Sequence, residues 1–84
     1  EVSSVYPNPF NPSTTIAFDV SQTTDLSIFI YDISGRLIET IANESFYPGK
    51  HSLNWHANGL SSGIYFAKIS SSSYSQTHKL MLMK

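Results

Sequence analysis

Residues 26–38 read LSIFIYDISGRLI, and this stretch predicts two β-strands joined by a tight turn. Its aliphatic residues share one face of an extended chain, because successive side chains of a strand point to opposite sides: they are Leu26, Ile28 and Ile30. Asp32 can accept hydrogen bonds from the backbone amides of the turn, and Gly35 can adopt the positive φ that ends a type I turn with a bulge. We therefore expect a β-hairpin around Asp32–Arg36.

The strands on either side of this turn carry further signals. Phe29 and Tyr31 give the first strand an aromatic second face, so we expect it to be central in a sheet and covered on both sides. In the next strand Leu37 and Ile38 are adjacent, and Ile41 follows three residues later. Strict alternation fails there, which predicts a β-bulge.

The same period of two continues along most of the chain. Further alternating stretches predict strands at 14–20, 51–56, 64–70 and 76–83, and turn residues separate them at 47–49, 58–63 and 70–75. No window has helical spacing. We therefore predict six or seven antiparallel strands in two packed sheets. We expect the hydrophobic core between the two sheets to depend on three aromatic side chains: Phe18, Trp55 and Tyr65.

The composition excludes several classes of function. The 84 residues suffice for one small domain, and five Lys and Arg against six Asp and Glu leave no basic stripe for nucleic acid. No apolar run approaches the roughly 18 residues of a transmembrane segment. Because there are no cysteines, disulfides and thiolate metal sites are excluded. The chain begins with Glu1 rather than Met, so we expect it to be a piece of a longer protein.

Few residues could support catalysis. His51 and His56 lie five positions apart in one predicted strand, so their side chains point to opposite faces and cannot easily share a metal ion. The three aspartates Asp19, Asp25 and Asp32 stand at strand ends and turns, where carboxylates commonly bind local backbone. We therefore predict that the domain is not an enzyme and has no catalytic, cofactor or metal site.

Exposed aromatic residues leave a carbohydrate-binding module open as an alternative. Trp55 alternates with Leu53 and is better explained as core. Phe46 and Tyr47, beside the turn at Pro48 and Gly49, are the better candidates for an exposed pair, but the interpretation that they pack over the end of the sandwich is favoured.

Residues 6–13 read YPNPFNPS and form an unusual segment. Its three prolines forbid a helix and cannot donate to a sheet, so they protect a sheet edge from aggregation. We expect Tyr6 and Phe10 to anchor this segment on the sheet.

Four stretches, YPNPFNPSTTI, IYDISGR, SGIYF and the terminal KLMLMK, together resemble a known family over about residues 5–84. The resemblance is to the type A C-terminal sorting domain of the type IX secretion system, which is related to flagellar hook-capping-type immunoglobulin-like domains. The matching positions are Pro7, Asn8, Pro9, Gly35, Gly63, Tyr65, Lys79, Leu80, Leu82 and Lys84.

The resemblance implies a seven-stranded antiparallel immunoglobulin-like β-sandwich of Greek-key type. Residues 1–5 would end a linker from an upstream cargo domain, and residues 6–84 would form the sorting domain. The domain would pass through the periplasm and outer membrane with the help of translocon and shuttle components. A sortase-like surface peptidase would then cut it off, leaving the cargo secreted or on the cell surface. A structural immunoglobulin-like spacer or assembly module is the alternative.

The terminal strand allows two interpretations. Its apolar side chains could bind the translocon by edge pairing or through an apolar face. Alternatively, Leu80 and Leu82 belong to the core, and the lysines guard a sheet edge.

Overall fold

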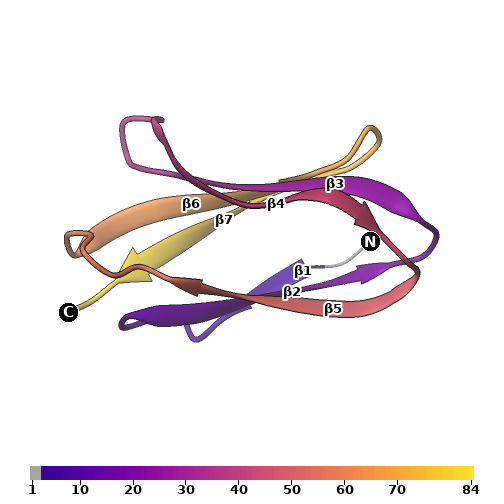
Figure 1. The fold of residues 1–84 in the computed structure, drawn as a ribbon. Coiled ribbons are helices and arrows are strands. Elements are labelled where there is room, and N and C mark those ends of the chain that lie inside the picture. Colours follow the sequence, from indigo (N-terminus) through magenta and orange to yellow (C-terminus); the bar gives the residue numbers. More distant parts are fainter. Residues whose placement is uncertain (1–2) are drawn as a thin grey trace.

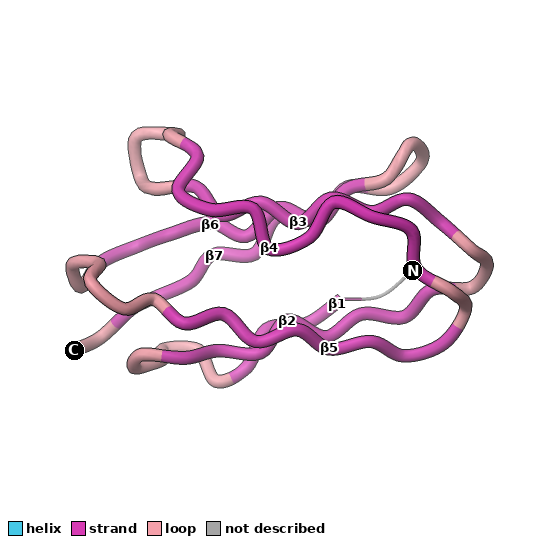
Figure 2. Tube along the Cα trace, viewed as in Figure 1, coloured by secondary structure: helices cyan, strands magenta, loops and turns pink. Residues whose placement is uncertain are grey.

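The computed structural model describes residues 3–84, which form seven β-strands joined by short loops (Figure 1, Figure 2). Within this range there is no helix, and so none that could cross a membrane. The strands are β1 (Ser3–Tyr6), β2 (Ser13–Val20), β3 (Thr24–Tyr31), β4 (Leu37–Phe46), β5 (Gly49–His56), β6 (Gly63–Ser70) and β7 (Ser75–Leu82). The turns predicted at 47–49, 58–63 and 70–75 are confirmed.

The strands form two sheets that face each other (Figure 1). The smaller sheet has the order β1-β2-β5 and the larger sheet the order β4-β3-β6-β7, with antiparallel pairing throughout. The chain passes from one sheet to the other three times, after β2, β4 and β5. The predicted all-β sandwich is confirmed, and its seven strands are consistent with an immunoglobulin-like fold.

The space between the sheets holds the hydrophobic core. Trp55, Phe18 and Tyr65 are all buried there, as predicted. The indole Nε1–H of Trp55 donates to Glu39 Oε1 at 2.8 Å, which satisfies the polar atom of a buried ring. Phe46 is also core, with its ring centroid 5.1 Å from that of Phe18, which confirms the favoured interpretation that it packs onto the sandwich. Tyr47, next to it in the turn, is exposed, so the favoured interpretation was wrong for this residue.

β3 is central, between β4 and β6, as the sequence predicts. Its inner side chains are buried, but Phe29 and Tyr31 on the outer face are only half-buried. The expectation of cover on both sides was therefore wrong, because no third layer lies over this sheet within residues 3–84.

The bulged strand is β4, as predicted. Its register against β3 shifts between Ile28 and Phe29 and again between Ile30 and Tyr31. Each shift leaves one residue of β4 without a partner, Ile41 at the first and Ile38 at the second. The two extra residues change which β4 side chains point inward.

Candidate functional site

The proline-rich segment and the C-terminal strand, although far apart in the sequence, lie side by side. The Phe10 N–H donates to the Met81 carbonyl at 2.9 Å, and the Met83 N–H donates to the Phe10 carbonyl at 2.9 Å. Phe10 and Leu82 form a parallel bridge through these contacts. The chain between β1 and β2 therefore adds a short pairing segment to the outer edge of β7.

The side chain of Asn8 extends this pairing toward Lys79. Its Nδ2 donates to the Lys79 carbonyl at 2.8 Å, and its Oδ1 accepts the Met81 N–H at 3.0 Å. One carboxamide thus supplies the donor and the acceptor that a neighbouring strand would offer, which suits a position where Pro7 and Pro9 have no N–H to give. We call residues 7–10 the clamp.

Two buried contacts hold the clamp in place. The Phe10 side chain is 2% exposed and its ring centroid lies 5.6 Å from that of Trp55. The buried Thr14 hydroxyl donates to the Pro7 carbonyl at 2.8 Å. The prediction of Phe10 as an anchor is confirmed, whereas Tyr6 is 54% exposed and does not anchor the segment. Tyr6 still belongs to β1, where alternation turns its side chain outward.

β7 has two different sides. Leu80 and Leu82 are buried, so the interpretation of these leucines as core is confirmed. Met81 and Met83 are exposed by 41% and 56% and point away from the core. Because the clamp already occupies the backbone groups from Lys79 to Met83, edge pairing by a partner would require its displacement.

The outward side of β7 continues onto β6. Ile64 stands opposite Met81 in the register, and Phe66 stands opposite Lys79. Both β6 side chains are half-buried. This outer surface therefore combines apolar and cationic side chains beside the C-terminus: Ile64, Phe66, Lys79, Met81 and Met83.

The later family-motif positions lie beside the same strand. Gly63 pairs with Leu82 and has a φ of 153°. Tyr65 pairs with Leu80, and its hydroxyl donates to the Ser61 carbonyl at 2.8 Å. The Lys84 N–H donates to Ser62 Oγ at 3.0 Å, which fastens the end of the chain to the loop before β6.

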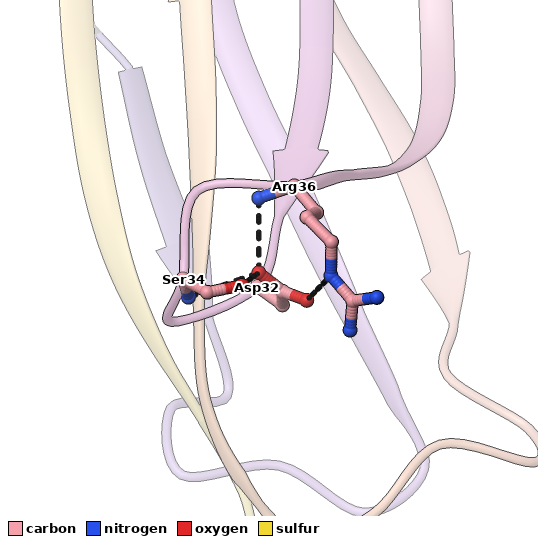
Figure 3. Close-up of polar contacts among 3 residues, drawn as sticks. All are labelled: Asp32, Ser34 and Arg36. Atoms are coloured by element: carbon pink, nitrogen blue, oxygen red, sulfur yellow. Dashed lines mark hydrogen bonds and ion pairs between the residues drawn. The ribbon is translucent and has the colours of Figure 1, made fainter.

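Gly35 is the motif position that the structure does not bring to β7. It lies in the β3–β4 hairpin with a φ of 89° and donates its N–H to the Asp32 carbonyl at 3.0 Å. Asp32 Oδ1 accepts the N–H groups of Ser34 and Arg36, and Oδ2 accepts Arg36 Nε–H at 3.0 Å (Figure 3). The hydrogen bond from the Arg36 backbone, followed by that from the Ser34 hydroxyl, lowers the pKa of Asp32 to about 2. The predicted hairpin is confirmed in detail.

A polar cluster that the sequence analysis missed joins β1 to β7. Ser3 Oγ lies 2.8 Å from His78 Nε2 and also contacts Gln76 and Tyr74. Burial lowers the pKa of His78, because desolvation disfavours its charged form. Only the strand order could have revealed this cluster, since Ser3 and His78 are 75 positions apart.

The other two histidines, His51 and His56, do not belong to the polar cluster around Ser3. His51 points inward and stacks on Phe18 with ring centroids 5.4 Å apart, whereas His56 is exposed and contacts Ser13 Oγ through Nδ1. Opposite orientations were predicted and are confirmed. Across residues 3–84, no three His, Cys, Asp or Glu side chains converge in a way that could hold a metal ion.

Comparison with known proteins identifies a family. The sequence model of the family described as secretion system C-terminal sorting domain matches residues 4–83. No curated protein is significantly similar to the chain.

The fold is similar to a solved structure from the structural and functional probing of PorZ. PorZ is described there as an essential bacterial surface component of the type-IX secretion system of human oral-microbiomic Porphyromonas gingivalis. The TM-score is 0.69 and the identity 24%, over 98% of this chain and 11% of that one. The chain therefore shares its fold with a small part of a much longer protein.

Proposed function

The chain belongs to the family of secretion system C-terminal sorting domains, the sorting signals of type IX secretion, and we propose that it works as a non-catalytic module that takes a larger cargo protein across the outer membrane. The observation that carries this proposal is the family match, which extends over residues 4–83. The strand order in sheets of three and four supports the immunoglobulin-like relation of the fold.

The cargo would precede this domain, and residues 1–5 would end the linker between them. β1 begins at Ser3, so strand pairing already starts within the last residues of that segment. After export, a sortase-like surface peptidase would remove the domain, and the cargo would be released or kept at the cell surface.

Translocon or shuttle components would recognise the outer surface of β7 rather than its edge. Two features support this choice. The clamp occupies the edge, and the exposed Met81 and Met83 offer flexible apolar side chains flanked by Lys79 and Lys84. The buried Leu80 and Leu82 would hold that surface in place without contacting the partner.

The first experiment fuses the 84 residues to the C-terminus of a fluorescent protein that carries an N-terminal signal peptide for export across the inner membrane, in a host with type IX secretion. We expect fluorescence outside the cell or on its surface, and retention in the periplasm of an isogenic strain that lacks the outer-membrane translocon. Equal export from both strains contradicts the proposal.

The second experiment separates recognition from folding. Truncation after Leu80 is unsuitable, because it removes the buried Leu82 and the Met83 N–H that pairs with Phe10. The double variant Met81→Ser/Met83→Ser changes only exposed side chains and should block export while thermal unfolding stays close to that of the original chain. The matched control Ile33→Ser/Tyr47→Ser also removes two exposed apolar side chains, both outside β6 and β7, and should be exported normally. Normal export of the methionine variant contradicts recognition through this surface.

A further inference from the structure

A hollow of about 380 Å³ is lined by residues of all three strands of the smaller sheet, and the lining side chains that alternate outward place it on the outer face of that sheet. Its size falls within the range of about 300–1,000 Å³ that is typical of small-molecule sites. The side chains that matter for its chemistry come from β1, β2 and β5: Ser4, Tyr6, Ala17, Asp19, Lys50 and Ser52.

The register explains why this face is hollow. Ser4, Ala17 and Ser52 stand side by side across the three strands, so a row of three small side chains forms the floor. The row toward one end contains Tyr6, Thr15 and Asn54, and the row toward the other contains Asp19 and Lys50. Larger side chains on both sides of a small-residue row leave a depression that is open to solvent.

The two ends of the hollow differ in chemistry. At one end Tyr6 is 54% exposed and provides an aromatic ring with a hydroxyl. At the other end Asp19 and Lys50 face each other in the register. The Asp19 carboxylate can accept hydrogen bonds there, and the Lys50 ammonium can donate them.

In the row that contains Tyr6, a hydrogen bond joins the side chains of Thr15 and Asn54. Thr15 Oγ1 donates to Asn54 Oδ1 at 2.9 Å, so the side-chain amide of Asn54 keeps its Nδ2–H groups as donors for a ligand. The outer face of this sheet is thus rich in hydroxyl and amide groups, whereas the opposite outer face presents Phe29, Tyr31 and Phe66.

We propose that this hollow binds a neutral hexose unit of a glycan. A sugar ring offers an apolar face to an aromatic side chain and hydroxyl groups that both donate and accept, which matches Tyr6 at one end and the Asp19/Lys50 pair at the other. The opposite charges of that pair cancel, so the site favours no net charge on its ligand. The ligand would bind weakly, with a dissociation constant on the order of a millimolar for one ring. This site is separate from the outer surface of β7, and the proposal does not depend on the proposed sorting function.

The test is an NMR titration of the ¹⁵N-labelled 84-residue chain with cellotetraose, maltotetraose, mannotetraose and, as an anionic probe, tetragalacturonate. We expect at least one neutral sugar to shift the amide signals of Ala17 and Ser52 in a saturable way, with smaller effects on β6 and β7. No saturable shift with any neutral sugar overturns the proposal, and so does a response to tetragalacturonate alone.

Two variants locate the site. Ala17→Arg fills the floor of the hollow and should abolish the shifts, whereas Thr77→Arg, an equally bulky change on the exposed face of β7, should preserve them. If Ala17→Arg does not fold, Tyr6→Ser serves in its place, because Tyr6 is exposed and its substitution should not disturb the fold. Tyr6→Ser should lower the affinity for the sugar at least several-fold. Unchanged binding in the folded variant overturns the assignment.

Discussion

The clamp and the β3–β4 hairpin both secure strands of the larger sheet, but they do so over very different distances along the chain. In the hairpin, Asp32 binds groups two and four residues away. In the clamp, Asn8 binds groups 71 and 73 residues away. Closing a long loop costs conformational entropy, so the clamp forms only when the rest of the sandwich positions β7. The hairpin depends mainly on its own five residues.

The clamp and the hairpin should differ most in the free energy of unfolding that is lost when one apolar side chain is removed from each. Phe10→Ala empties a buried site against Trp55 and should lower the free energy of unfolding by about 3–5 kcal/mol. That loss is a large part of the roughly 5–15 kcal/mol that stabilises most domains. Ile33→Ala, at a 73% exposed position of the hairpin, should change it by less than about 0.5 kcal/mol. Urea unfolding measures both, and similar losses would show that the clamp is not anchored by Phe10.

A smaller effect is expected from the carboxamide of the clamp. Asn8→Ala removes two hydrogen bonds to β7 at an exposed site, where water replaces part of the loss, and should cost about 1 kcal/mol. Asn11→Ala is the matched control, since Asn11 also precedes a proline but its side chain makes no hydrogen bond to any part of residues 3–84. Thermal unfolding distinguishes them, and equal melting temperatures would contradict the role of Asn8.

Acid should affect the hairpin and the polar cluster that joins β1 to β7 in different pH windows. The pKa of His78, which contacts Ser3 in that cluster, is lowered in the folded state, so the unfolded chain binds the proton more readily. Stability should therefore decrease as the pH falls from about 6.5 through the lowered pKa. Urea unfolding across this window should show the slope, and His78→Gln should flatten it. A His78→Gln variant with the same slope as the original chain would contradict the assignment.

The hairpin should respond only at much lower pH. The folded-state pKa of Asp32 is about 2, against an ordinary value of 3.8, so its contribution is complete above about pH 4 and is lost as the pH falls through 2. An NMR titration of the Asp32 carboxyl carbon measures this pKa directly. A midpoint near 3.8 would show that the backbone hydrogen bonds of the turn do not favour its charged form.

The same contrast explains what could be predicted from the sequence. The hairpin was predictable because Asp32 and Gly35 carry its donors, acceptors and positive φ within one short stretch. The clamp was predicted only as a proline-rich edge segment, because pairing Asn8 with β7 requires the strand order of the folded chain.

The two terminal motifs form one unit, in which the clamp covers the edge of β7 and leaves its outward side chains exposed. Amide hydrogen exchange at Met81 and Met83 tests it most directly, because their N–H groups bind Asn8 Oδ1 and the Phe10 carbonyl. We predict slow exchange at both amides in the original chain, faster exchange at Met81 in Asn8→Ala, and no change at Met81 in Asp32→Asn. Exchange at Met81 and Met83 as fast as in an unpaired strand edge would contradict the claim.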